Sequence, residues 1–135
     1  GGANQAPKAS GKKKGPKKPD AEPAEDVEQI SIDEFFRVQM KVAQVTSAEA
    51  VPKTDKLLKI TLRVGEQERT VVSGIAQFYD PADLPGRRVV VVTNLKPAKL
   101  RGIISEGMIL AAEDADGNLA LVEPDKQLPS GATVR

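Results

Sequence analysis

The chain has 135 residues, with 20 Lys and Arg against 19 Asp and Glu, so its formal net charge is +1. This length accommodates one domain of ordinary size. Cysteine, histidine and tryptophan are absent, which excludes disulfide bonds, Cys/His metal sites, and catalysis by an imidazole base or a thiolate. Carboxylates alone remain able to hold Mg²⁺ or Ca²⁺, but no motif points to a metal or another cofactor, and we expect none.

The first 29 residues differ in composition from the rest. Val27 is their only branched aliphatic residue, and Gly, Ala, Pro, Lys and Glu dominate. Such a segment cannot bury enough apolar surface to offset the entropy lost on ordering, so residues 1–29 are predicted to be a disordered linker. Its lysine cluster leaves two other interpretations open, a nucleic-acid arm and a nuclear signal. The sequence predicts neither a membrane span nor a secretory signal, and we expect a cytoplasmic protein with no membrane partner.

Residues 30–135 are predicted to form one folded domain that begins with a short helix. Ser31-Ile32-Asp33-Glu34 has the pattern of a capping box. The helix should end at Phe35 or Phe36, and we expect both phenylalanines to pack beneath it.

Strands follow, indicated by a hydrophobic period of two and by turn residues. The predicted strands span residues 38–45, 58–64, 70–73, 87–94, 107–112 and 119–122. Four consecutive valines, Val89–Val92, predict burial on both faces of the fourth strand. Before it, residues 75–79 are predicted to form one helical turn that ends at Pro81.

Short strands with few helices predict an all-β fold. Five or so strands, with a short helix between the third and fourth, fit an OB-fold: a five-stranded barrel with short helices and a C-terminal extension. An SH3-like barrel is the alternative.

No arrangement of residues supports catalysis. The acidic residues at 80–83 and 113–116 lie in turn-like sequence, which is typical of solvated loops. Ser105 has no histidine to activate it, and no glycine-rich phosphate loop follows a strand. The chain is therefore predicted not to be an enzyme and to have no small-molecule substrate.

A binding site is better supported. From Arg87 to Ser105 there are five cations and no acid, and such a cluster attracts phosphates. Loops on a rigid barrel often carry function, although a solubilising loop is an equally good interpretation. With few aromatic residues for base stacking, we expect recognition of folded RNA by shape and backbone. Further candidate contacts are Arg87, Arg88, Phe78 and Tyr79. One of the two aromatic residues, Phe78 or Tyr79, could instead belong to the core.

Several segments resemble the tRNA-binding domain family: Asp55–Lys59, Val72–Ile75 and, most specifically, Asn94–Gly102 followed by Ser105–Ala112. That family includes the C-terminal domain of bacterial methionyl-tRNA synthetase, free-standing dimeric tRNA-binding proteins and the cytokine-like domain of synthetase cofactors. The start of the domain, Ile30–Phe36, resembles the synthetase version most.

The resemblance implies an OB-fold with its tRNA contacts in the last block. It maps the contacts onto Asn94, Lys96, Lys99, Arg101, Ser105 and Met108. Met108 also suits a core position. The chain departs from the family at Ala98, where a cation is common, and at Leu100, where methionine is frequent. The missing cation should weaken phosphate binding.

The resemblance also implies a role. The chain would be a non-catalytic, appended tRNA-binding and homodimerisation domain of an ATP-dependent methionine–tRNA ligase whose catalytic signatures it lacks. The dimer is expected to form through Ile32, Phe35 and Phe36 and through the segment after Pro124. The near-neutral charge and the scarcity of aromatic residues favour the alternative, a protein–protein scaffold or chaperone-like dimer of the same fold.

Overall fold

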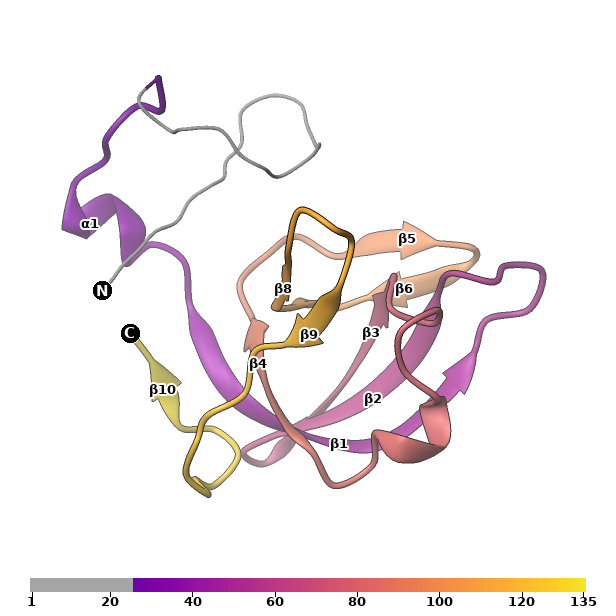
Figure 1. Ribbon diagram of the computed structural model, residues 1–135. Coiled ribbons are helices and arrows are strands. Elements are labelled where there is room, and N and C mark those ends of the chain that lie inside the picture. Colours follow the sequence, from indigo (N-terminus) through magenta and orange to yellow (C-terminus); the bar gives the residue numbers. More distant parts are fainter. Residues whose placement is uncertain (1–25) are drawn as a thin grey trace.

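The structure is a computed structural model that describes residues 26–135, so the predicted linker lies almost entirely outside the described residues. Strands dominate the described part (Figure 1). The elements are α1 (Ile32–Phe35), β1 (Met40–Ala50), β2 (Leu58–Val64), β3 (Gln67–Ser73), the 3₁₀ helix η1 (Pro81–Asp83), β4 (Arg88–Val92), β5 (Ala98–Leu100), β6 (Ile103–Ser105), β7 (Met108–Ile109), β8 (Ala111–Glu113), β9 (Leu119–Leu121) and β10 (Thr133–Val134).

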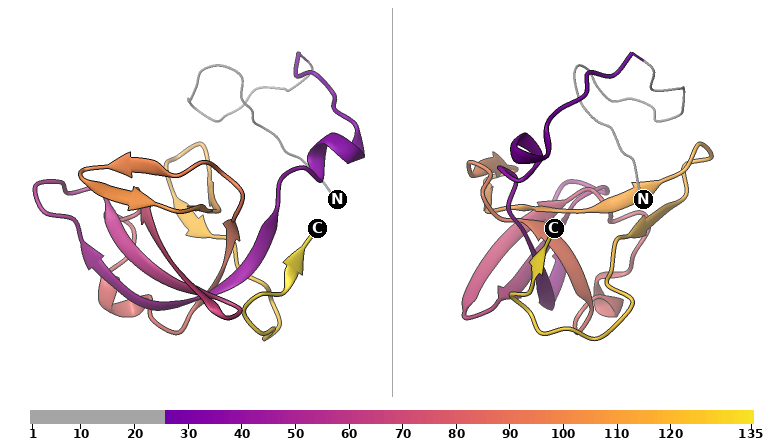
Figure 2. Two further views of the ribbon diagram at one scale, coloured as in Figure 1. Left: turned by 180° about the vertical axis from the view of Figure 1, so that it is seen from behind. Right: turned by 90° about the vertical axis from the view of Figure 1, so that its left-hand side faces the viewer.

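A curled antiparallel sheet forms the body of the domain. Its strand order is β3-β2-β1-β4-β7, and β10 pairs with the start of β1. The long β1 pairs with β4 through its first half and with β2 through its second half. The register shifts between Val45 and Ser47 because β1 has an extra residue there. Such a bulge lets the strand bend around the core. The result is an OB-like barrel, as the sequence predicts (Figure 2).

Both faces of β4 are buried, which confirms the prediction from the four valines. Val89 and Val91 have no exposed surface and belong to the main core. Val90 and Val92 pack with Met40 in a second cluster on the other face. β4 lies between β1 and β7, and the side chains of its four valines pack inside the protein on both faces.

The hairpin of β2 and β3 supplies the opposite wall of the core. β2 has the bounds that the alternation predicts, and its Leu58, Ile60 and Leu62 are at most 1% exposed. Gly65 and Glu66 form the predicted turn into β3. Burial of these three side chains stabilises the fold by roughly 1.5–3 kcal/mol each.

The N-terminal helix has the predicted capping box but not the predicted packing. Ser31 Oγ accepts a hydrogen bond from the Glu34 amide at 3.1 Å, and Glu34 Oε1 accepts one from the Ser31 amide at 3.0 Å. Phe35 and Phe36 are 38% and 43% exposed and contact each other edge to face. The expectation that they pack beneath the helix is wrong, because a helix of four residues stands away from the barrel and covers nothing (Figures 1 and 2).

Two further expectations change in detail. The Tyr79 amide donates to the Ile75 carbonyl at 3.1 Å, so one hydrogen-bonded turn forms there. Pro81 does not end this turn but opens η1 as its first residue, a position where the missing N–H is no loss. The predicted strand over residues 107–112 is divided between β7 and β8.

Within residues 26–135, no helix combines the length and the apolar character that crossing a bilayer requires.

Candidate nucleic-acid interface

The basic segment, defined here as residues 94–105, contains a β-hairpin where the sequence suggests a loop. β5 and β6 pair so that Ala98 faces Ser105, Lys99 faces Ile104 and Leu100 faces Ile103. Arg101 and Gly102 form the two-residue turn, with φ of 51° and 82°. Positive φ at both positions is what a type I′ hairpin turn requires. This turn joins β5 and β6 into the two-stranded hairpin seen in Figure 1, and Lys99 and Arg101 belong to it.

Alternation along the hairpin separates its two faces. Ser105 is 5% exposed and bonds to β3, so the face that carries Ser105 and Ala98 is turned toward the barrel. Lys99 and Ile104 share the opposite face because side chains alternate along a strand. Both are exposed, Ile104 by 56%. The outward face thus combines a cation with an apolar side chain.

The three predicted cations of this segment are available to a ligand. Lys96, Lys99 and Arg101 are exposed, and none of them takes part in an ion pair with a residue in 26–135, where the pairs are Lys59–Glu49 and Arg87–Glu123. Met108, which the spacing also allows in the core, is 49% exposed. These four side chains are thus accessible from solvent.

Ser105 is used by the fold itself. Its hydroxyl accepts a hydrogen bond from the Val72 amide at 3.0 Å and donates one to the Gly107 carbonyl at 3.1 Å. A buried hydroxyl with both bonds satisfied is not free to contact a phosphate. Ser105 instead fixes the hairpin to β3.

Asn94 also bonds within the protein. Its Oδ1 accepts a hydrogen bond from the Gln39 amide at 2.9 Å, and its Nδ2 donates to the Arg37 carbonyl at 2.7 Å. The side chain thereby joins the start of the basic segment to the residues between α1 and β1. The sequence predicts Asn94 as a tRNA contact; the residue is exposed, and its Oδ1 and Nδ2 each already bond within the protein.

The additional candidates do not act together. Arg87 forms an ion pair with Glu123, with 3.0 Å between Nε and Oε2, and stacks over the Tyr79 ring. Tyr79 packs against the main core, and its hydroxyl accepts a hydrogen bond from the Leu121 amide at 3.0 Å. Arg88 is half-buried, and its Nε has no hydrogen-bond partner. Among the four, only Phe78, at 43% exposure, remains an accessible aromatic side chain.

Gly107 explains why the turn from β6 to β7 is so tight. A Cβ at this position would lie 2.9 Å from the Val92 carbonyl oxygen and 3.0 Å from a methyl group of Val91. Only glycine fits such a close approach of two strands. The residue therefore holds β7, with Met108, against β4.

Arg69 is the residue that the sequence reasoning missed. Its Nη1 donates to the carbonyl oxygens of Thr93 and Glu106, at 2.8 and 3.1 Å, and these residues flank the basic segment. Arg69 lies between the predicted turn at Gly65-Glu66 and the predicted strand 70–73, far in sequence from residues 94–105, so no local pattern points to it.

The acidic turn between β8 and β9 is solvated. Asp114 accepts hydrogen bonds from the Asn118 side chain and amide and from the Asp116 amide. These bonds, the Asn118 side chain first, lower the pKa of Asp114 below its ordinary value of 3.8. Within residues 26–135, no three acidic side chains are grouped closely enough to hold a metal ion.

Fold and site together define a class: an OB-like barrel with a basic hairpin on its rim, the kind of barrel that binds oligonucleotides through strands and loops. Residues 40–133 match the family described as "Putative tRNA binding domain". The chain belongs to this family, and it is a binding module rather than a catalytic one.

Relatives connect the chain to methionyl-tRNA synthetases. It is 57% identical over 115 residues to the methionine–tRNA ligase of Deinococcus radiodurans, covering 85% of this chain and 17% of the ligase. It is 47% identical over 119 residues to the ligase of Methanocaldococcus jannaschii, covering 88% of this chain and 18% of the ligase. The chain thus spans less than a fifth of these relatives and is related to their C-terminal region.

Solved structures share the fold. A methionyl-tRNA-synthetase-related protein from Pyrococcus horikoshii is 41% identical with a TM-score of 0.77, covering 81% of this chain and all of that one. The chaperone CsaA from Bacillus anthracis is 26% identical with a TM-score of 0.73, covering 80% and 100%. The same barrel therefore occurs in proteins named for two different roles.

Proposed function

We propose that this chain is the appended tRNA-binding and homodimerisation domain of a cytoplasmic methionine–tRNA ligase. It holds tRNA by backbone and shape and thereby supports aminoacylation in protein synthesis. Family membership and the relatives support tRNA as the ligand class. The observation that carries the site is the β5–β6 hairpin, which presents Lys99 and Arg101 exposed and without a carboxylate partner in residues 26–135.

Phosphate binding explains the chemistry of the site. Each phosphate that a lysine or arginine neutralises releases counterions, so binding is driven by charge and weakened by salt. Lys96, Lys99 and Arg101 supply this charge, and Met108 supplies an adaptable apolar contact to a sugar or base. In the proposed site, Asn94 and Ser105 support these residues from behind.

Dimerisation is supported by the apolar residues around α1. Ile32, Phe35 and Phe36 are 64%, 38% and 43% exposed. Large apolar side chains gathered on an exposed surface usually mark an interaction site. The partner proposed for this surface is α1 of a second copy. Because α1 and the β5–β6 hairpin lie at different ends of the molecule (Figures 1 and 2), a dimer of this kind leaves both hairpins open.

A chaperone-like or scaffold function is the second candidate. The similarity to CsaA favours it, as does the exposed apolar surface around α1. In that case the apolar residues would bind a protein client instead of a second copy.

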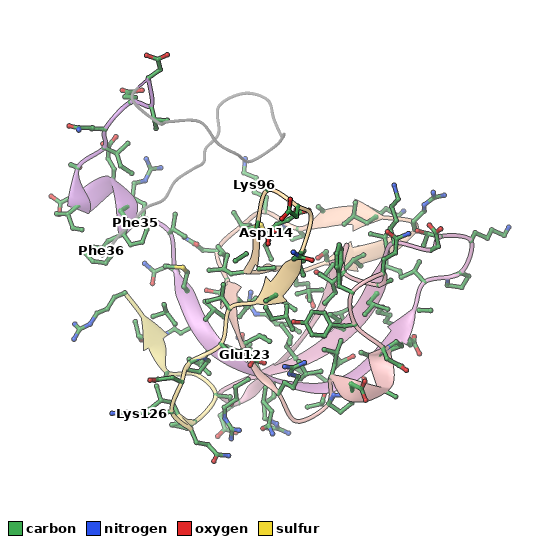
Figure 3. All side chains as sticks on the ribbon, in the orientation of Figure 1. Phe35, Phe36, Lys96, Asp114, Glu123 and Lys126 are labelled. Atoms are coloured by element: carbon green, nitrogen blue, oxygen red, sulfur yellow. The ribbon has the colours of Figure 1, made fainter. Side chains whose placement is uncertain are left out.

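A pair of double variants tests the RNA site. We expect Lys99→Ala/Arg101→Ala to weaken tRNA binding at least tenfold and to lower the salt dependence of log K by about 0.7–0.9 per lost phosphate contact. The control, Arg63→Ala/Lys126→Ala, removes the same charge from exposed positions elsewhere. In Figure 3, Lys96, which belongs to the basic segment, lies at the upper side of the barrel and Lys126 at its lower side.

Filter binding or fluorescence anisotropy over a salt series provides the measurement. Equal losses in both double variants would show that bulk charge, and not the hairpin, binds tRNA. If the unmodified chain binds no tRNA but suppresses aggregation of an unfolded protein, the chaperone-like function is the correct one.

A further inference from the structure

Arg69 lies on β3, outside the basic segment, yet its guanidinium reaches both ends of that segment. Nη1 donates to the Thr93 carbonyl at 2.8 Å and to the Glu106 carbonyl at 3.1 Å. Thr93 immediately precedes residues 94–105 and Glu106 immediately follows them. A single nitrogen atom therefore closes the base of the segment that carries the hairpin.

The guanidinium is itself held in place. Its Nε and Nη2 donate to Gln67 Oε1 at 3.3 and 3.2 Å, and the residue is half-buried. Arginine has five N–H donors in a planar fork, and these four hydrogen bonds use all but one of them. Arg69 is consequently committed to the protein and has little capacity left for a phosphate.

The two ends of the segment are otherwise attached to different parts of the barrel. At one end, the Thr93 amide donates to the Gln39 carbonyl at 2.8 Å. At the other end, Glu106 exchanges hydrogen bonds with Thr70, whose amide donates to Glu106 Oε1 at 2.9 Å and whose carbonyl accepts from the Glu106 amide at 2.8 Å. Arg69 joins the two attachments directly.

We propose that Arg69 is a positioning residue that holds the β5–β6 hairpin in its RNA-binding geometry by tying Thr93 to Glu106. The inference rests on the proposed function, because it concerns the same site. Binding is weaker when a ligand must first order the residues that contact it. A hairpin fixed at its base presents Lys99 and Arg101 without that entropic cost.

Three variants test the proposal. Arg69→Gln removes the charge and the fork, and Arg69→Lys keeps the charge but cannot reproduce the fork. Arg63→Gln is the matched control, since Arg63 is an exposed arginine on the neighbouring strand β2. Hydrogen exchange of the β5–β6 amides is measured without RNA, and tRNA affinity is measured over a salt series.

We expect both Arg69 variants to accelerate exchange of the hairpin amides and to weaken tRNA binding by roughly tenfold. The slope of log K against log salt should stay unchanged, because no phosphate contact is lost. Arg63→Gln should leave exchange as it is. Restored affinity in Arg69→Lys, or a slope lowered by about 0.7–0.9 in Arg69→Gln, would make Arg69 a phosphate contact and overturn the proposal.

Should Arg69→Gln fail to fold, Gln67→Ala provides the milder test, because it removes only the acceptor that holds the guanidinium. Faster hairpin exchange and a smaller loss of affinity would support the proposal, and unchanged exchange would overturn it. The exchange experiment needs no RNA, so it can fail while the unmodified chain still binds tRNA. Absence of tRNA binding by the unmodified chain would instead contradict the proposed function.

Discussion

Arg101 adopts a backbone conformation that is costly for its side chain. Its φ of 51° lies in the left-handed region, which disfavours residues with a Cβ by roughly 1–2 kcal/mol and which asparagine and glycine visit more readily. A turn built for stability alone would have Asn-Gly at these positions. An arginine thus occupies the tip of the hairpin against the preference of the turn, which agrees with the phosphate contact proposed for it.

The corresponding variant, Arg101→Asn, should separate stability from binding. We expect opening of the hairpin to cost about 1 kcal/mol more, measured by hydrogen exchange of the β5–β6 amides, while tRNA affinity falls several-fold through the lost phosphate contact. Arg101→Lys should keep most of the affinity without the gain in stability. An Arg101→Asn variant that binds tRNA as well as the unmodified chain would exclude Arg101 from the site.

At the scale of elements, two hairpins on the rim are held by different means. The β5–β6 hairpin is fixed to β3 by Ser105 and by Arg69. The β8–β9 hairpin is closed by its own turn, in which Asp114 accepts hydrogen bonds from Asn118 and Asp116. The second device depends on an ionised carboxylate, and so it should respond to pH.

The sign of this response follows from the direction of the shift. The pKa of Asp114 in the folded chain is lowered below 3.8 by these hydrogen bonds, chiefly the one from the Asn118 side chain. Their stabilising effect is therefore fully present above 3.8 and is lost as the pH falls through the lowered pKa. We expect the amide resonances of Asn118 and Asp116 to shift with a midpoint below 3.8 in an NMR titration. An Asp114→Asn variant should lack this transition, and a midpoint at or above 3.8 would contradict the assignment.

Asn94 connects the elements at the other end of the basic segment. Its side-chain amide bonds to the backbone of Arg37 and Gln39. Asn94 thereby joins the chain between α1 and β1 to the start of the basic segment.

At the scale of the whole molecule, the exposed apolar residues around α1 form the surface proposed for dimerisation. The family match begins at residue 40, so α1 lies outside it, and the interface rests on the exposure of Ile32, Phe35 and Phe36. We expect a dimer in solution that Phe35→Ser/Phe36→Ser weakens at least tenfold, since buried aromatic residues dominate such interfaces. Analytical ultracentrifugation over a concentration series measures this.

Phe78→Ser is the matched control for the dimer, because Phe78 is as exposed as Phe36, each at 43%, but lies outside α1. It should leave the association constant unchanged. A monomeric mass for the unmodified chain at all concentrations, or a double variant that still dimerises, would rule out α1 as the interface.

The barrel could be predicted from the sequence because its strands show a clear hydrophobic period. Leu58, Ile60 and Leu62 alternate with polar residues, and the valines of β4 form an unbroken run, so periodicity alone places them in the core. The capping box at Ser31 and Glu34 is equally local, since its bonds join residues three positions apart. Such features need no knowledge of the rest of the chain.

The β5–β6 hairpin could not be predicted from the sequence in this way. Each of its strands has three residues, too few for a period to emerge, and Arg-Gly is not a usual turn pair. The positive charge of the segment is a property of the sequence, and so is its likeness to the family. Its shape is not.

The sequence by itself determined the class of fold, the neutral overall charge and the segment where cations gather, because periodicity and composition are properties of neighbouring residues. Only the tertiary structure decided which of those side chains are free and which are used by the fold. Ser105 is buried and accepts a hydrogen bond from the Val72 amide, and Arg69 on β3 bonds to the residues at both ends of the basic segment. Contacts between residues far apart in the chain assign these roles, and no local pattern encodes them.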